Sequence, residues 1–242
     1  MKENNSSKKI LLIGGGTGMG KATAIYLAKK NHQVIISGRR KEKLDEVASL
    51  SSGIYPKQAD ITDRDSTSRL FSWYQDKFGD LDVLINAAGI NIANRTLREI
   101  SSEEWDKVIR INLTGSFNCL TEALKIMRVK KSGLIIMINS VAGKRATPLA
   151  GVAYNASKFG MHALTVSASE EERENGIRIT NIYPGEVNTP ILEERHSPPS
   201  AEHRSKILQP DDIAKVIDHL ITLPERVHIP ELIIKPNLQS YI

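Results

Sequence analysis

The chain has 242 residues, of which 40% are hydrophobic and 25% charged, and its formal net charge is +5. These values are typical of a soluble globular protein, and no apolar run is long enough to span a membrane. The single cysteine, Cys119, excludes an intrachain disulfide and a cysteine-rich metal cluster, and the six histidines lack metal-ligand spacing, so we expect no metal site.

The positive charge favours a solvated surface with one local anion site over a nucleic-acid interface. The basic residues are scattered along the chain and do not alternate with aromatic residues. Residues 1–9 are polar and basic, and the apolar run behind them is too short for a signal peptide. We therefore expect a flexible N-terminal tail on a cytoplasmic protein that binds neither nucleic acid nor membranes.

Apolar, strand-like runs alternate with helical patterns along the chain. The runs are rich in Val, Ile and Leu, as expected for strands that are covered on both faces of a parallel sheet. We expect strands at Lys9–Ile13, Gln33–Ser37, Ile54–Gln58, Leu81–Asn86, Gly133–Asn139, Ile177–Tyr183 and Glu231–Lys235. We expect helices near residues 18–30, 41–51, 63–78, 102–130, 151–175 and 210–222. One doubly wound α/β domain over residues 10–242 fits this pattern.

Ligands of such sheets bind beyond the carboxyl ends of the strands, so we expect the functional residues at these ends. The first strand is followed by a glycine-rich turn, GGGTGMG, with spacing G-x-x-x-G-x-G. Such glycines permit a tight exit from the strand, close approach of a pyrophosphate and close helix–strand packing. A glycine-rich loop without a ligand is the alternative interpretation. The candidate cofactor residues of this turn are Gly14, Thr17, Gly18, Met19 and Gly20.

The second strand ends in Gly38, Arg39 and Arg40. An NAD site usually has an acidic residue here, which binds the ribose 2′-hydroxyl. A guanidinium instead fits a 2′-phosphate with two hydrogen bonds. Because the acidic residue is missing and two bases are present, the sequence indicates NADP(H). The alternative is that both arginines merely open a solvated helix.

The third strand leads into Asp60 and Ile61, which are candidates for contacts with adenine. Asp60 could instead cap the next helix through Thr62 or Asp63. The fourth strand ends in small residues that would let a flat cofactor lie against the backbone. These candidates are Asn86, Ala87, Ala88 and Gly89.

The fifth strand ends at Ser140, and a helical segment then places Tyr154 and Lys158 four residues apart on one face. A phenol with its ordinary pKa of about 10 exchanges protons slowly at neutral pH. A nearby ammonium favours the phenolate and lowers that pKa, which makes the phenol a tunable acid or base. A serine hydroxyl close by can hydrogen-bond the same substrate oxygen.

Together these motifs resemble the short-chain dehydrogenase/reductase family, in its compact form of about 250 residues. The resemblance runs from Ile10 to the C-terminus. The motifs that carry it are the glycine turn, NAAG at Asn86–Gly89, RINLTGSF around Asn112, NSVAG around Ser140, YNASK at Tyr154–Lys158 and IYPGEVNT at Ile182–Thr189.

The resemblance implies a seven-stranded Rossmann sheet and a catalytic set of Asn112, Ser140, Tyr154 and Lys158. In the family, this tyrosine donates a proton to the carbonyl oxygen as hydride arrives, and the serine hydrogen-bonds that oxygen. The lysine holds the ribose of the nicotinamide, and the asparagine kinks its helix and holds a water for proton relay. The residues implied to flank the nicotinamide are Pro184, Gly185, Val187 and Thr189.

The resemblance therefore implies an NADP(H)-dependent oxidoreductase that acts on a small carbonyl or secondary alcohol substrate as a homodimer or homotetramer. The alternative is a catalytically silent NADP-binding sensor or scaffold. Two departures concern the glycine turn, where Ile13 replaces a frequent threonine and Thr17 replaces a frequent base. Three stretches are expected to line the substrate pocket: Ile90–Arg95, the segment between Ser140 and Tyr154, and a polar substrate loop at about residues 189–209.

Overall fold

A computed structural model describes residues 7–240, which contain one seven-stranded, entirely parallel sheet with the strand order β3-β2-β1-β4-β5-β6-β7. The strands are β1 (Lys9–Ile13), β2 (Gln33–Gly38), β3 (Ile54–Gln58), β4 (Val83–Asn86), β5 (Gly133–Ile138), β6 (Ile177–Pro184) and β7 (Glu231–Ile234). This is the expected doubly wound Rossmann fold. Residues 1–6 of the expected tail lie outside the described residues, and Lys9 already belongs to β1.

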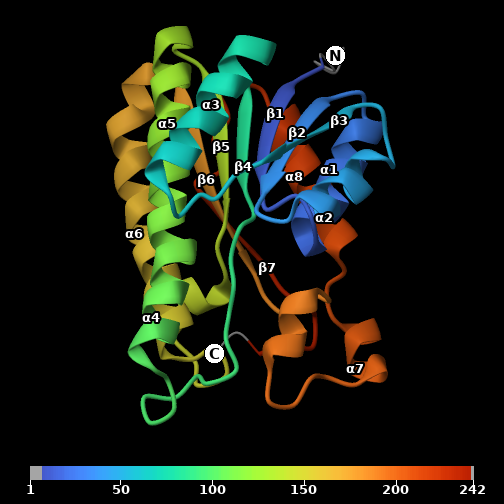
Figure 1. The fold of residues 1–242 in the computed structure, drawn as a ribbon, viewed down its shortest axis with the longest axis vertical. Coiled ribbons are helices and arrows are strands. Elements are labelled where there is room, and N and C mark those ends of the chain that lie inside the picture. Colours follow the sequence, from blue (N-terminus) through green and yellow to red (C-terminus); the bar gives the residue numbers. More distant parts are fainter. Residues whose placement is uncertain (1–6, 241–242) are drawn as a thin grey trace.

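Helices cover both faces of the sheet (Figure 1). The α-helices are α1 (Gly18–Lys29), α2 (Lys41–Ala48), α3 (Arg64–Phe78), α4 (Ser102–Ile109), α5 (Gly115–Lys130), α6 (Val152–Glu172), α7 (Ala201–Lys206) and α8 (Pro210–Thr222). The shorter turns are η1 (Arg110–Thr114), η2 (Val141–Gly143), η3 (Arg173–Asn175) and η4 (Pro190–Glu194).

The alternation of side chains along the strands builds two cores. In β1, Ile10 and Leu12 belong to the core under α1 and α8, whereas Leu11 and Ile13 belong to the core under α3, α5 and α6. All four side chains are almost completely buried, because successive residues of a central strand face opposite covered faces.

Two expected elements differ from the structure in an informative way. The expected helix over residues 102–130 is α4 and α5 joined by a π-helical segment, Arg110–Thr114, which contains Asn112. The expected loop after Thr189 contains the 3-10 turn η4 and the short helix α7, which begins after the capping residue Ser200. A hydrophobic-periodicity pattern cannot distinguish a one-residue π-bulge from continuous helix, and a six-residue helix carries little periodicity.

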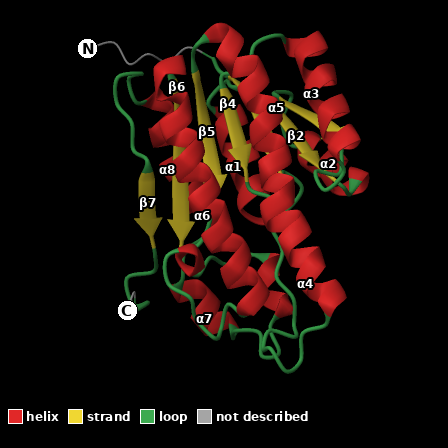
Figure 2. Ribbon diagram, turned by 90° about the vertical axis from the view of Figure 1, so that its left-hand side faces the viewer, coloured by secondary structure: helices red, strands yellow, loops and turns green. Residues whose placement is uncertain are grey.

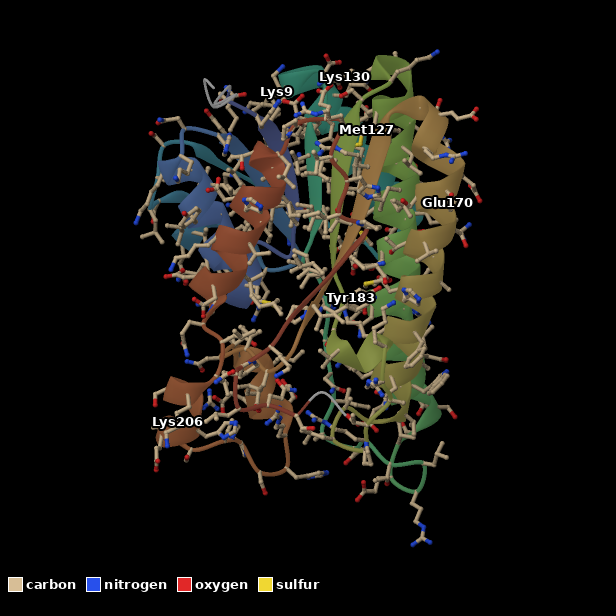
Figure 3. The ribbon with its side chains drawn as sticks, turned by 180° about the vertical axis from the view of Figure 1, so that it is seen from behind. Lys9, Met127, Lys130, Glu170, Tyr183 and Lys206 are labelled. Atoms are coloured by element: carbon tan, nitrogen blue, oxygen red, sulfur yellow. The ribbon has the colours of Figure 1, made fainter. Side chains whose placement is uncertain are left out.

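All seven strands end on the same side of the molecule, because the sheet is parallel. Helices α4 and α7 lie beyond these strand ends (Figure 2). Lys206 of α7 lies at the opposite end of the molecule from Lys9 and Lys130 (Figure 3). Lys9 is the first residue of β1, so these two lysines lie at the end of the molecule where the strands begin. Within residues 7–240, no helix has both the length and the apolar character that crossing a membrane would require.

Candidate functional site

A groove of about 630 Å³ runs across the carboxyl ends of the central strands. It combines most of the residues that the sequence singled out for cofactor binding. Those that line it are Gly14, Thr17, Gly18, Met19, Gly20, Arg39, Arg40, Asp60, Ile61, Ala87, Ala88, Gly89 and Thr189. The groove lies at the strand-order reversal between β1 and β4, which is where open α/β sheets bind their ligands.

The glycine turn has a geometry that only small residues allow. Gly14 has φ of +83°, and a Cβ there would lie 2.7 Å from the backbone nitrogen of Ala88. A Cβ on Gly20 would overlap the carbonyl oxygen of Gly14, so helix α1 packs directly against the turn. Thr17, the N-cap of α1, makes no side-chain capping hydrogen bond. The first amides of α1 therefore lack a side-chain cap and face the groove, as at a phosphate site.

Three cations border the groove beside this turn. Arg39 and Arg40 are exposed and form no salt bridge within residues 7–240, and Arg40 Nη2 lies 3.5 Å from Thr17 Oγ1 as a long hydrogen bond. Lys43, in the first turn of α2, also lines the groove and pairs with Glu46 at 3.0 Å. Sequence reasoning missed Lys43, although its place one helical turn after the arginines was a usable signal.

Asp60 and Ile61 line the groove next to the arginines. The Asp60 carboxylate accepts hydrogen bonds from the amide and hydroxyl of Thr62, both at 2.9 Å. The cap of α3 is instead Asp63, which accepts from the amides of Asp65 and Ser66. Asp60 thus orders its own turn and still borders the groove.

The wall after β4 is formed by Ala87, Ala88 and Gly89, whereas Asn86 supports it from beneath. The Asn86 side chain is fully buried, accepts a hydrogen bond from the Ala88 amide at 3.2 Å and donates to Ser116 Oγ at 2.9 Å. Asn86 therefore holds the backbone of the wall in place and does not itself line the groove.

Asn112 sits in the π-helical segment between α4 and α5. Its Oδ1 accepts from the amide of Ile90 at 2.8 Å, and its Nδ2 donates to the Ile90 carbonyl at 2.9 Å and to Ser157 Oγ at 3.1 Å. The side chain therefore ties the wall after β4 to α6, which carries Tyr154. Single-turn π-bulges recur at functional sites because they turn a side chain out of the helical pattern.

Lys158 is buried beneath Tyr154 on α6. Its Nζ donates to the Ile138 carbonyl at 3.0 Å and lies 5.6 Å from the centre of the Tyr154 ring. Only 2% of Lys158 is exposed, and burial lowers its pKa to about 7. The ammonium that the sequence analysis expects to activate Tyr154 therefore releases its proton far more readily than a solvated lysine does.

Burial raises the pKa of Tyr154, and a hydrogen bond with Ser140 and the charge of Arg95 oppose that rise. Ser140 follows β5 and caps the turn η2, where its Oγ accepts from the amide of Ala142 at 3.1 Å. The structure therefore brings Ser140, Tyr154 and Lys158 together. None of the three side chains lines the groove itself, but Lys158 Nζ and Asn112 Oδ1 each lie 3.6 Å from where a Cβ on Gly89 of the groove wall would be. The sequence analysis named Arg95 only as the last residue of an expected pocket-lining stretch. Its proximity to Tyr154 could not be predicted, because the two residues are far apart in the sequence.

Of the four residues expected to flank the nicotinamide, only Thr189 lines the groove. Pro184 and Val187 are buried, and the amide of Gly185 donates to the carbonyl of Ile234 in β7 at 2.7 Å. Within residues 7–240, no group of three or more His, Cys, Asp or Glu side chains is placed to hold a metal ion.

Comparisons with known proteins agree with this geometry. The family described as short chain dehydrogenase matches residues 8–199. A protein of Staphylococcus aureus (strain USA300), described as an uncharacterized oxidoreductase, is 31% identical over 96% of this chain and 98% of its own.

Solved structures are similar over nearly the whole chain. The closed form of serine dehydrogenase complexed with NADP⁺ has a TM-score of 0.88 at 26% identity and covers 96% of each chain. An alcohol dehydrogenase from the archaeon Thermococcus sibiricus, complexed with 5-hydroxy-NADP, has a TM-score of 0.85 at 25% identity and covers 97% of this chain and 99% of its own. The family match, the relative and the strand order together show that this chain belongs to the short-chain dehydrogenase/reductase family of oxidoreductases.

Proposed function

We propose that the protein transfers a hydride between NADP(H) and a small carbonyl or secondary alcohol substrate. The observation that carries this proposal is the convergence of Ser140, Tyr154 and Lys158, with the Lys158 Nζ 3.6 Å from where a Cβ on Gly89 of the groove wall would lie. The alcohol dehydrogenase and the serine dehydrogenase described above were solved with an NADP-type ligand, which supports the choice of coenzyme.

The chemistry of the groove fits NADP(H). The glycine turn and the first amides of α1 would hold the pyrophosphate, and Arg39 and Arg40 would hold the 2′-phosphate. Asp60 and Ile61 border the place for adenine. When bound, NADPH supplies the hydride that reduces the carbonyl carbon.

The side chains of the protein supply the proton that the carbonyl oxygen receives. The Tyr154 hydroxyl donates its proton to the carbonyl oxygen, while the Ser140 hydroxyl hydrogen-bonds the same oxygen. Lys158 holds the nicotinamide ribose, and its hydrogen bond to the Ile138 carbonyl keeps its Nζ beneath the phenol. Asn112 fixes the wall against α6 through Ile90 and Ser157, and the water-mediated proton relay that the family resemblance implies remains a prediction.

The test is a panel of ketones and aldehydes assayed by loss of reduced-nicotinamide absorbance with NADPH and with NADH. Tyr154→Phe should lower turnover by about 100-fold or more while NADPH binding stays intact, because general acid catalysis contributes a factor of that order. Retention of most activity in this variant would refute the mechanism. NADPH binding without turnover of any compound would favour the alternative, a silent sensor or scaffold.

We also propose that residues 10–242 act as one cytoplasmic unit that assembles into a homodimer or homotetramer. Helices α5 and α6 lie side by side and present Phe117, Phe159 and Val166 to the outside, each more than 40% exposed (Figures 1 and 2). Exposed apolar side chains on neighbouring helices are typical of a protein interface. Light scattering of the wild type and of Val166→Glu would test this assembly, and a monomeric wild type would refute it.

A further inference from the structure

One guanidinium joins the three segments that surround the catalytic end of the groove. Arg95 donates from Nε to the carbonyl of Ile92 at 2.7 Å and from Nη1 to the carbonyl of Leu149 at 2.7 Å. Its Nη2 donates to the carbonyl of Glu194 in η4 at 2.9 Å. The three acceptors lie in the loop after β4, in the loop between η2 and α6, and in the substrate loop.

The backbone of Arg95 also fixes the beginning of α6. Its carbonyl accepts a hydrogen bond from the amide of Val152, the first residue of that helix, at 3.0 Å. Gly151 has φ of +84°, and a Cβ there would lie 2.6 Å from the Cβ of Arg95. Tyr154 lies only two residues after Val152, so this packing fixes the position of the backbone that carries the Tyr154 side chain.

Arg95 keeps its positive charge beside the phenol without a carboxylate partner. Its side chain is half-buried and forms no salt bridge within residues 7–240. The charged and polar groups that face Tyr154 are Arg95, the hydroxyl of Ser140 and the Nζ of Lys158 beneath the ring. Glu194 and Arg195 lie close enough to Arg95 to act on it with opposite signs.

Only arginine suits this place chemically. A planar guanidinium has five N–H donors in a fixed fork, so it reaches three carbonyls in different directions and still keeps its charge. A lysine ammonium in the same position would hold the charge but could not reproduce the fork.

We propose that Arg95 is a positioning residue for Tyr154. It holds the substrate loop and the start of α6 in one arrangement and provides a fixed positive charge that favours transfer of the phenolic proton. This inference rests on the proposed function, because it assigns Arg95 a role in the reaction of Tyr154.

The experiment compares Arg95→Met and Arg95→Lys with the matched control Arg98→Met. Arg98 is exposed on the same loop and makes no hydrogen bond or salt bridge within the described residues. Three readouts are taken: the Kd of NADPH by fluorescence, the pH profile of kcat/KM for an accepted carbonyl compound, and hydrogen–deuterium exchange of the first turn of α6 and of the substrate loop.

For Arg95→Met, kcat/KM should fall at least tenfold with an NADPH Kd within twofold of wild type. The alkaline limb of the pH profile should move to higher pH, because loss of the cation makes the phenol a weaker acid. Exchange should become faster in both segments. Arg95→Lys should restore the pH profile but not the slow exchange, and Arg98→Met should behave as wild type.

Three outcomes would overturn the inference. They are unchanged exchange in Arg95→Met, a pH profile identical to that of Arg98→Met, or a kcat/KM within twofold of that control. The second outcome, together with faster exchange, would identify a purely structural clamp. If the wild type turned over no carbonyl at all, the proposed function would fall, and exchange at the start of α6 would still decide whether Arg95 positions this helix.

Discussion

Replacing Lys158 with methionine should change how stability depends on pH. Burial lowers the pKa of Lys158 from 10.5 to about 7, so the folded protein releases a proton that the unfolded chain still holds between those two pH values. Because the unfolded state binds more protons in this window, stability rises with pH there. A neutral methionine of similar length removes the titrating group and should flatten this rise.

The magnitude follows from the same pKa values. One pKa unit corresponds to about 1.4 kcal/mol, so the cost of Lys158 burial falls by about 2 kcal/mol between pH 7 and pH 9. Lys158→Met should therefore be about 4 kcal/mol more stable than wild type at pH 7, less whatever is lost by leaving the Ile138 carbonyl unbonded, and the difference should shrink by about half at pH 9.

The assay is urea unfolding followed by circular dichroism at pH 7, 8 and 9 without coenzyme. Lys215→Met is the matched control, because Lys215 is exposed on α8 and has no salt bridge within residues 7–240. Its stability should parallel that of wild type across the range. If the wild type and Lys158→Met gave parallel pH profiles, the ammonium of Lys158 would not be desolvated as the structure indicates, and the reasoning would be wrong.

Three further predictions follow from the groove and the substrate loop. Gly20→Ala should destabilise the protein by about 1–3 kcal/mol in urea unfolding and weaken NADPH binding in fluorescence titration, because its methyl group would force the turn apart. In the control Gly38→Ala the methyl group has room, so neither the stability nor the NADPH affinity should change. Arg39→Ala should weaken NADPH binding far more than NADH binding, and equal losses would contradict the phosphate assignment. Glu186 pairs with Arg195 and His203 of the substrate loop at 2.5 and 2.6 Å, so Glu186→Gln should speed tryptic cleavage of that loop at pH 7.

The cluster of Glu186, Arg195 and His203 also makes the stability of the substrate loop depend on pH. Hydrogen bonds and charges from His203 and Arg195 outweigh the desolvation of Glu186, so its pKa in the folded protein is lowered. A carboxyl group with a lowered pKa stabilises the fold above its unfolded pKa and loses that contribution as pH falls through the folded pKa. The substrate loop of the wild type should therefore be protected from proteolysis at neutral pH and lose this protection in acid, below the ordinary glutamate range. Equal protection at every pH, measured with a protease that stays active in acid, would contradict this pairing.

Much of the fold could be predicted because its signals are local. Strand β1 matches its expected bounds, since a continuous apolar run with sharp polar ends leaves little choice, and the weaker, alternating run of β3 matches as well. The glycine turn could be predicted for the same reason. Its positive φ restricts Gly14 to glycine, and close packing against the Gly14 carbonyl oxygen restricts Gly20. The π-bulge at Asn112 and the helix α7 were not, since neither leaves a periodic pattern.

Local patterns in the sequence were sufficient to predict the doubly wound sheet, the glycine turn and the residue types that could exchange a proton, because each depends on neighbours a few positions apart. The pKa of Lys158 and the charge beside Tyr154 depend instead on the tertiary structure. It buries Lys158 until its pKa nears neutrality, and it brings Arg95 to the Glu194 carbonyl across 99 positions of the chain. Such contacts depend on which strand ends meet at the reversal of the sheet, and no local pattern encodes the desolvation or the charge that results.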